Sequence, residues 1–261
     1  MKIITWNINR FDGVWDWYEK KDKDTEYRKN MAEEIIGYLV KLISNEDDVA
    51  VLQEFPYYEY NGSIQWGCDE YSNWTSLFEK NNLTVIEPYK KGLNVTVAVV
   101  PKQKSVWKKT DGDDCKTSFK DGYLNKYIEL LKEFRILGIH LPSSSVLLPL
   151  LHGMGEADRP DLILGDFNSG DYVIKNRWDE ERECERQQYR KLINVYGYTD
   201  ISGGGVTNHI TGSSIDHFLI KNTMLFRLDI KNVFIDDNKT LPTLSTLSDH
   251  YPIIVELEKK F

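Results

Sequence analysis

The sequence predicts an α/β protein that folds as a single domain. Short apolar runs typical of buried strands recur along the chain, and amphipathic stretches with a helical period lie between them. A length of 261 residues fits one or two domains. Since no repeat, low-complexity tract or linker divides the chain, we expect residues 1–261 to form one domain with its own hydrophobic core.

The first half of the chain predicts both strands and helices. Residues 2–8 alternate apolar and polar side chains, as a half-buried strand does. A helix from Thr25 to about Asn45 is predicted by an apolar stripe at helical spacing, which consists of Tyr27, Met31, Ile35, Leu39 and Leu42. Further strands are expected at residues 49–55, 83–87 and 94–100, with a helix from Asn73.

The second half continues the same pattern. Residues 127–131 and 134–141 predict a hairpin, and an apolar run leads into Asp166. Residues 178–194 are strongly charged with a sparse apolar stripe, which is typical of a surface helix. The remaining expected elements are a short helix at 146–154 and strands at 214–220, 228–235 and 253–257.

The composition of the chain indicates which partners it binds and in which cellular compartment we expect it. A net charge of -8 argues against a broadly basic surface for nucleic acid, but an acidic site can still act on phosphates through a bound cation. The cysteines Cys68, Cys115 and Cys184 are odd in number and far apart, which predicts reduced thiols. With no signal peptide pattern and no apolar run near the roughly 20 residues of a membrane span, we expect a cytoplasmic protein, and a monomer.

The sequence Gly165-Asp166-Phe167-Asn168 follows a predicted buried strand directly. Residues two apart on an extended backbone point the same way, so Asp166 and Asn168 are expected to converge past the strand end. A carboxylate can hold a water or a metal, and a carboxamide can hold a phosphate oxygen without adding charge. The structural alternative is an Asx turn in which both side chains cap their own backbone, and it accounts for about half of such patterns.

Other polar residues recur at predicted strand ends. They are the types that metal-assisted hydrolysis of a phosphate ester needs: carboxylates for a hard cation, imidazoles for proton transfer and amides for phosphate oxygens. Singly, each has a structural explanation, such as a solvated strand end for Glu54 or a hydrogen-bonded core residue for His140. The set comprises Asn7, Glu54, His140, Asp216, Asp249 and His250.

Two further features leave alternatives open. A lysine-rich segment is either a contact surface for a polyanion or a solvated hairpin; its lysines are 102, 104, 108, 109, 116 and 120. Aromatic residues near Trp15 and Tyr57 could stack on unpaired bases or form a small apolar cluster under a loop.

Taken in order, the motifs resemble the endonuclease/exonuclease/phosphatase family. They cover nearly the whole chain and are TWN (Thr5 to Asn7), QE (Gln53, Glu54), HLP (His140 to Pro142), GDFN (Gly165 to Asn168), ID (Ile215, Asp216) and SDH (Ser248 to His250). The resemblance implies a four-layer α/β/β/α sandwich in which two mixed β-sheets pack face to face. It also implies a metal-dependent phosphoric ester hydrolase that uses Mg²⁺, with Mn²⁺ as an alternative.

The resemblance further implies roles for individual residues. Glu54 would be the principal Mg²⁺ ligand, with Asn7 and Asp249 beside the metal. Asp166 would orient or activate the attacking water, while Asn168 would hold a phosphate oxygen. His250, oriented by Asp216, would contact the phosphate or act as a base.

His140 matches a histidine that acts on the leaving group in the deoxyribonuclease, phosphatase and sphingomyelinase branches of the family. In the deoxyribonuclease branch a glutamate supports this histidine, and its place is near Asn94 here. His140 is therefore expected to lack a carboxylate partner. Since apurinic endonucleases of the family place a tyrosine in this neighbourhood, a dedicated abasic-site enzyme is disfavoured.

Three functions follow as hypotheses. The first is a nuclease or nucleic-acid phosphodiesterase acting on DNA or RNA by in-line attack of water. The second is a phosphatase or phosphodiesterase for a small or lipid phosphate ester, which the acidic net charge and His140 favour. The third, a binding module that has lost catalysis, is disfavoured by the intact set of acidic and histidine residues.

Overall fold

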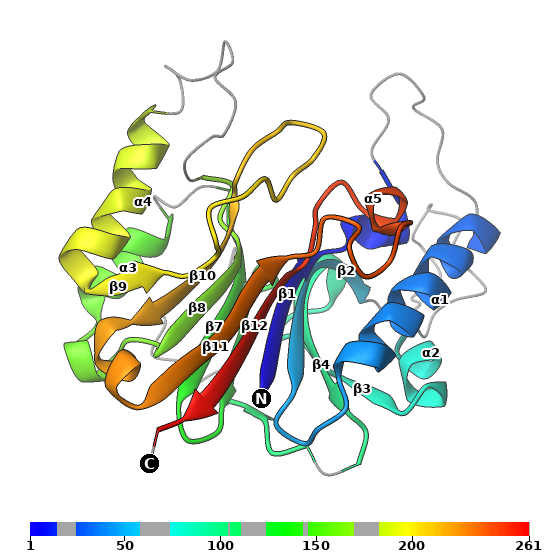
Figure 1. Cartoon of the computed structure of the whole chain (residues 1–261), viewed down its shortest axis with the longest axis horizontal. Coiled ribbons are helices and arrows are strands. Elements are labelled where there is room, and N and C mark those ends of the chain that lie inside the picture. Colours follow the sequence, from blue (N-terminus) through cyan, green and yellow to red (C-terminus); the bar gives the residue numbers. More distant parts are fainter. Residues whose placement is uncertain are drawn as a thin grey trace.

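The structure is a computed structural model that describes residues 1–14, 25–57, 74–103, 105–110, 124–142, 146–169 and 183–260. Within them, the chain folds into two six-stranded sheets with helices outside (Figure 1). The side chains of Cys68, Cys115 and Cys184, and the aromatic residues around Trp15, lie outside the description.

The first sheet has the strand order β11-β12-β1-β2-β4-β3. Its strands are β1 (Lys2–Asn7), β2 (Val49–Tyr57), β3 (Leu83–Ile86), β4 (Gly92–Pro101), β11 (Leu228–Ile235) and β12 (Ile253–Lys259). Strands β1 and β2 run parallel and the other neighbours antiparallel. The sheet is therefore mixed, and it places the last strand of the chain beside the first.

The second sheet has the order β5-β6-β7-β8-β10-β9. Its strands are β5 (Lys108–Lys109), β6 (Tyr127–Leu131), β7 (Arg135–His140), β8 (Leu162–Asp166), β9 (Tyr198–Asp200) and β10 (Asp216–Lys221). Here β7 and β8 form the parallel pair, and the other neighbours are antiparallel. Both sheets thus have the same mixed character.

The helices cover the outer faces of the two sheets. In Figure 1, α1 (Thr25–Leu42) and α2 (Trp74–Lys80) lie on one side, while α3 (Leu147–Gly153) and α4 (Glu183–Tyr196) lie on the other. No helix in the described ranges combines the length and apolar character that a membrane span needs. The short helical elements are η1 (Asn9–Phe11), η4 (Glu156–Asp158), η5 (Asn222–Phe226) and α5 (Leu244–Leu247).

Strand alternation produces three apolar cores between four layers. In β1, Ile4 faces the core that contains Ile35 of α1, whereas Ile3 faces the core between the sheets. In the second sheet, Leu164 joins that central core, and Ile163 faces the third core with Leu192 of α4. The predicted four-layer sandwich is confirmed.

The predicted elements agree with the structure apart from their ends and a few short elements. Strands β5 and β9, with two and three residues, were not predicted because they are too short to show an alternation. Asp216 begins β10 instead of lying inside a strand. Glu54 lies within β2, which continues to Tyr57 across an irregularity in its pairing with β4.

The sandwich has one edge at which the polar strand ends gather. Parallel strands end at the same edge, and this applies to β1 with β2 and to β7 with β8. The antiparallel strands β10 and β12 begin there, because Asp216 pairs with Asp166 and Ile253 pairs with Thr5. Segments from the whole length of the chain therefore meet at this edge.

Candidate active site

Three predicted site residues lie side by side across the second sheet. Asp166, at the end of β8, pairs in register with His140 at the end of β7 and with Asp216 at the start of β10. All three are at least nine-tenths buried. Their juxtaposition is a direct result of sheet register, so the sheet brings together groups that lie up to 76 residues apart in the chain.

Gly165 is required for Asp166 to occupy this position. Its φ of +139° is a conformation that side chains of L-residues rarely adopt. A Cβ placed on Gly165 would lie 1.9 Å from the carbonyl oxygen of Ile139 on β7. The close approach of β8 to β7 just before the site therefore admits no side chain.

Glu54 reaches the site from the first sheet through an irregular backbone. Its φ is +53°, in the left-handed region, and the pairing of β2 with β4 shifts register between Leu52 and Phe55. A bulge of this kind turns a side chain away from the regular alternation, and such strain often accompanies functional sites.

Asn7 connects the two sheets at the site. Its carboxamide nitrogen Nδ2 donates to Glu54 Oε1 over 3.3 Å and to Asp166 Oδ2 over 3.0 Å. Its carbonyl oxygen Oδ1 accepts the backbone N–H of Asn9, which fixes the orientation of the amide. Two carboxylates from different sheets are thus held together by one amide group.

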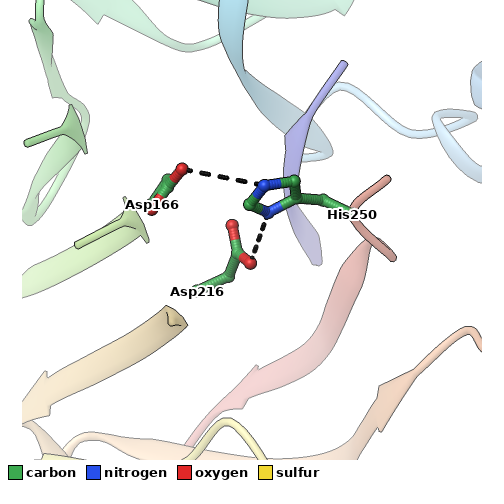
Figure 2. Close-up of side chains that lie close together, drawn as sticks. All are labelled: Asp166, Asp216 and His250. Atoms are coloured by element: carbon green, nitrogen blue, oxygen red, sulfur yellow. Dashed lines mark hydrogen bonds and ion pairs between the residues drawn. The ribbon is translucent and has the colours of Figure 1, made fainter. Parts of the chain in front are cut away.

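His250 lies between two carboxylates, as Figure 2 shows. Its Nδ1 lies 2.7 Å from Asp216 Oδ2, and its Nε2 lies 4.0 Å from Asp166 Oδ2. Burial of the ring lowers its pKa, but the Asp216 carboxylate and two further carboxylates outweigh burial and raise the pKa to about 10. The pairing with Asp216 that the resemblance implies is present as a contact.

Other residues of the same motifs have a scaffold role. Trp6 of TWN donates from Nε1 to the carbonyl oxygen of His250 over 2.8 Å. Ser248 of SDH donates from Oγ to the carbonyl oxygen of Asn7 and accepts the backbone N–H of His250. These bonds fasten the turn that carries His250 onto β1.

Asn168 forms the turn that the sequence left open as an alternative. Its backbone N–H donates to Asp166 Oδ1 over 2.8 Å, and its Nδ2 donates to the carbonyl oxygen of Leu141 over 2.7 Å. With a φ of +48°, the residue closes a tight turn after β8. The turn therefore uses Asn168 to connect the ends of β7 and β8, and a contact to phosphate stays a prediction.

Asp249 approaches the same ring nitrogen of His250 as Asp166 does. Its Oδ2 is 4.0 Å from His250 Nε2 and accepts a hydrogen bond from Nδ2 of Asn208 over 3.4 Å. The carboxylate is one-fifth exposed, which is more than those of Asp166 and Asp216. It is therefore the more accessible acidic group beside the histidine.

The donor atoms at this edge fit a hard divalent cation. Asp166, Asp216 and His250 offer ligand atoms that lie within 4.8 Å of one another. Within the described ranges, Asp216 Oδ1 is buried and has no hydrogen-bond partner, which is costly unless a ligand reaches it. Burial and the Asp216 carboxylate together raise the pKa of Asp166 to about 7, against the opposing effects of His250, Asn168 and Asn7. A cation would relieve both costs.

This trio differs from the predicted metal ligands Asn7, Glu54 and Asp249. The two sets share one neighbourhood, because Asn7 bonds both Glu54 and Asp166, while Asp249 contacts His250. Within the trio, Asp216 Oδ2 and His250 Nδ1 already contact each other. Oxygen atoms of the predicted set suit a magnesium-type ion better than an imidazole does.

Among the residues of the site that sequence reasoning missed, two contact its histidines. Lys126 places its Nζ 3.4 Å from Nδ1 of His140, and Asn208 places its Nδ2 3.0 Å from Nε2 of His250. Extending the predicted hairpin by one residue would have opposed Lys126 to His140, because Tyr127 pairs with Ile139. Asn208 carries no such signal, since it lies in a loop 42 residues before its partner.

Only part of the lysine-rich segment and its aromatic neighbours falls in the described ranges. Lys102 lies 3.8 Å from a Glu79 carboxylate oxygen, and Lys109 lies over the Tyr89 ring. Tyr57 donates its hydroxyl to Glu87 and packs on Phe55. These contacts favour the structural alternatives, whereas lysines 104, 116 and 120 lie outside the description.

Comparison with known proteins gives similarity in structure but not in sequence. Neither a family model nor a curated protein sequence matches the chain. A 3'-5' exonuclease (NExo) from Neisseria meningitidis matches 99% of this chain and 100% of its own, with a TM-score of 0.63 at 17% identity. An AP endonuclease from Archaeoglobus fulgidus matches 99% of both chains, with a TM-score of 0.65 at 17% identity.

A third structure carries the family name itself. It is an endonuclease/exonuclease/phosphatase from Beutenbergia cavernae, matched over 99% of this chain and 71% of its own, with a TM-score of 0.58 at 14% identity. The protein has the endonuclease/exonuclease/phosphatase fold. In this endonuclease/exonuclease/phosphatase fold, the strand ends that carry the motifs lie at one edge of the sandwich.

Proposed function

We propose that the protein hydrolyses phosphate esters with a bound divalent cation, and that its substrate is a nucleic acid. The observation that carries this proposal is His250 held by Asp216 and facing Asp166, with Glu54 joined to Asp166 through Asn7. Support for nucleic acid comes from the neighbours in structure, which include nucleases and a 3' phosphatase from Neisseria bound to a product DNA hairpin.

Glu54 would be the principal ligand of Mg²⁺ or Mn²⁺, with Asn7 and Asp249 beside it. When bound, the cation would withdraw negative charge from a phosphate oxygen. The unpaired oxygen of Asp216 and the raised pKa of Asp166 support a cation at this edge.

The protein's own residues would orient water and substrate. Asp166 would accept a proton of the attacking water at Oδ2, because a buried carboxylate with a raised pKa takes up a proton more readily than an exposed one. His250, held by Asp216, would contact a phosphate oxygen through Nε2. Asn168 would hold another phosphate oxygen, so that water attacks in line with the leaving oxygen.

A phosphatase or phosphodiesterase for a small or lipid phosphate is the second candidate. It is favoured by the net charge of -8, which repels a long polyanion more than a small ester. We also propose a monomeric, cytoplasmic enzyme in a single domain.

A substrate panel tests the proposal. Purified protein is incubated with plasmid DNA, DNA and RNA oligonucleotides, 3'-phosphorylated DNA, inositol phosphates and sphingomyelin, each with Mg²⁺, Mn²⁺ or EDTA. We expect cleavage of a nucleic acid that EDTA abolishes. Turnover confined to the small or lipid esters would favour the second candidate, and no turnover with any substrate would overturn the hydrolase.

Two variants locate the activity at this site. Glu54→Gln should weaken metal binding, and His250→Ala should reduce turnover by at least about a hundredfold. The matched controls are Glu33→Gln and His152→Ala, which alter exposed side chains on α1 and α3. Wild-type rates in Glu54→Gln and His250→Ala would place the chemistry elsewhere.

A further inference from the structure

The polar neighbour of His140 at Nδ1 is a lysine. The ammonium nitrogen Nζ of Lys126 lies 3.4 Å from His140 Nδ1. The two residues also share a backbone hydrogen bond, from the N–H of His140 to the carbonyl oxygen of Lys126 over 2.7 Å. Because Lys126 directly precedes β6 and His140 ends β7, the hairpin itself holds the pair together.

The chemistry of an ammonium group decides the tautomer of His140. A lysine ammonium has three hydrogen-bond donors and no acceptor, so the ring nitrogen that faces it must accept. Nδ1 of His140 is then unprotonated, and the single ring proton lies on Nε2. The Nε2–H group points toward Glu54 Oε1, at 3.7 Å, and Asp166 Oδ2, at 3.8 Å.

We propose that Lys126 is a positioning residue that holds His140 in its Nε2–H tautomer, so that His140 meets a phosphate oxygen of the substrate as a neutral hydrogen-bond donor. The phosphate rests on the function proposed above, whereas the tautomer rests on the geometry of the pair. His140 then binds and polarises the phosphate, and it does not serve as an imidazolium acid for the leaving group.

The charges around His140 agree with this role. Lys126 faces it from the start of β6, Glu54 from β2 and Asp166 from β8, while His250 and Asp216 lie farther into the site. Burial, together with the cations Lys126 and His250, lowers the pKa of His140 to about 3 against the opposing effect of Asp216. This direction agrees with the contact at Nδ1, which by itself requires an unprotonated Nδ1.

The two histidines of the site have opposite partners. His250 has a carboxylate at Nδ1, which accepts a proton and favours the charged ring. His140 has an ammonium group at the same ring atom, which donates and favours the neutral ring. Burial lowers the pKa of Lys126, and Glu54 and Asp166 oppose that change.

The tautomer is measured directly by ¹⁵N NMR of the full chain labelled at histidine, without substrate. The signals of His140 are assigned by their loss in His140→Gln. We expect an unprotonated Nδ1 and a protonated Nε2 from pH 6 to pH 8, with and without Mg²⁺. A protonated Nδ1 in the wild type over this range would overturn the proposal, whatever the enzyme's activity.

Three substitutions of Lys126 test whether this residue sets the tautomer of His140. Lys126→Arg should keep the Nε2–H tautomer, because arginine also has donors only. Lys126→Met should give a mixture of tautomers, and Lys126→Glu should place the proton on Nδ1 and let the ring titrate. An unchanged His140 spectrum in both Lys126→Met and Lys126→Glu would refute the role of Lys126. The control is Lys90→Met, at an exposed lysine.

Kinetics on the substrate found by the panel give a second readout. Lys126→Met should lower kcat/KM about tenfold, Lys126→Arg should restore most of it, and Lys126→Glu should add an ionisation to the pH profile. Equal rates and pH profiles in all of these variants would overturn the contact of His140 with substrate. A wild type without activity would overturn the proposed function and leave the NMR result to decide the tautomer.

Discussion

The carboxamide nitrogen Nδ2 of Asn208 lies 3.0 Å from Nε2 of His250. The amide cannot turn over freely, because its Oδ1 accepts both the backbone N–H and the hydroxyl of Thr211. A donor facing Nε2 favours the neutral ring, whereas Asp216 on the other nitrogen favours the charged ring. The protonation of His250 is therefore set by a loop residue as well as by its carboxylate.

Replacing Asn208 by leucine, which has a similar shape, should shift the balance toward the charged ring. The pKa of His250 should rise further above its usual 6.5, and kcat should fall about tenfold, as expected for the loss of one polar contact beside the ring. The pH profile and the ¹⁵N signals of His250 measure both effects. Asn232→Leu, on an exposed part of β11, is the control, and an unchanged pH profile in Asn208→Leu would contradict the role.

Gly165→Ala should unfold the protein at a lower temperature and reduce turnover. The added Cβ would lie 1.9 Å from the Ile139 carbonyl oxygen, at a φ that alanine rarely adopts. A loss of more than about 2 kcal/mol of unfolding free energy is expected. Gly37→Ala in α1 is the matched control: it meets nothing within 4 Å, so it should stabilise the helix slightly. Equal stability of the two variants would be evidence against the close approach of β8 to β7.

Asp166→Asn should raise the melting temperature of the metal-free protein at pH 8. The folded pKa of Asp166 is raised to about 7, so ionisation destabilises the fold progressively as the pH rises from about 4 to about 7. The gain from asparagine should be largest at pH 8 and vanish below about pH 3, where the wild-type carboxyl is protonated in both states. Thermal unfolding across this range in EDTA measures it; a gain that is independent of pH would exclude Asp166 as the cause.

Divalent cations should stabilise the wild type in the same experiment. Because Mg²⁺ or Mn²⁺ competes with protons for the carboxylates, the rise in melting temperature should be greater at pH 8 than at pH 6. Glu54→Gln should lose most of this rise, whereas Glu33→Gln should keep it. A rise that Glu54→Gln retains in full would move the metal away from Glu54.

Asp200→Asn should destabilise the protein at neutral pH by about 2 kcal/mol. Burial raises the pKa of Asp200, but hydrogen bonds from His217 and from two hydroxyl groups outweigh burial and lower it to about 2. This stability is present above about pH 4 and is lost as the pH falls through about 2. Denaturant unfolding at pH 7 and pH 3 measures it, with Asp237→Asn at an exposed ion pair as the control. A destabilisation that stays constant down to pH 2 would show that ionisation is not its source.

The Asp200 carboxylate also bears on the site. Nδ1 of His217 lies 3.0 Å from Asp200 Oδ2, and its Nε2 lies 2.9 Å from the carbonyl oxygen of Ser169, the residue directly after the turn at Asn168. It points away from the site because it follows Asp216 in β10, where neighbouring side chains alternate. In the sequence, the ID motif is followed by His217, but the alternation of side chains along the strand places only Asp216 in the site.

The sequence by itself determined the strands, the main helices and the kinds of side chain that end the strands. Apolar alternation encodes which face of a strand is buried, and this pattern is local, so it can be read without coordinates. It also carried the resemblance, because Asn7, Glu54, Asp166 and His250 stand in motifs.

Other contacts between site residues were decided only by the tertiary structure. The left-handed backbone of Glu54 depends on a bulge, and the contact between Asn208 and His250 depends on a loop that joins residues 42 apart in the chain. Hydrogen bonds form between neighbours in space, and a donor or acceptor has no preference for residues near it in sequence. The residue types therefore indicated the chemistry, while the packing of the chain set the polar neighbours of His140 and His250.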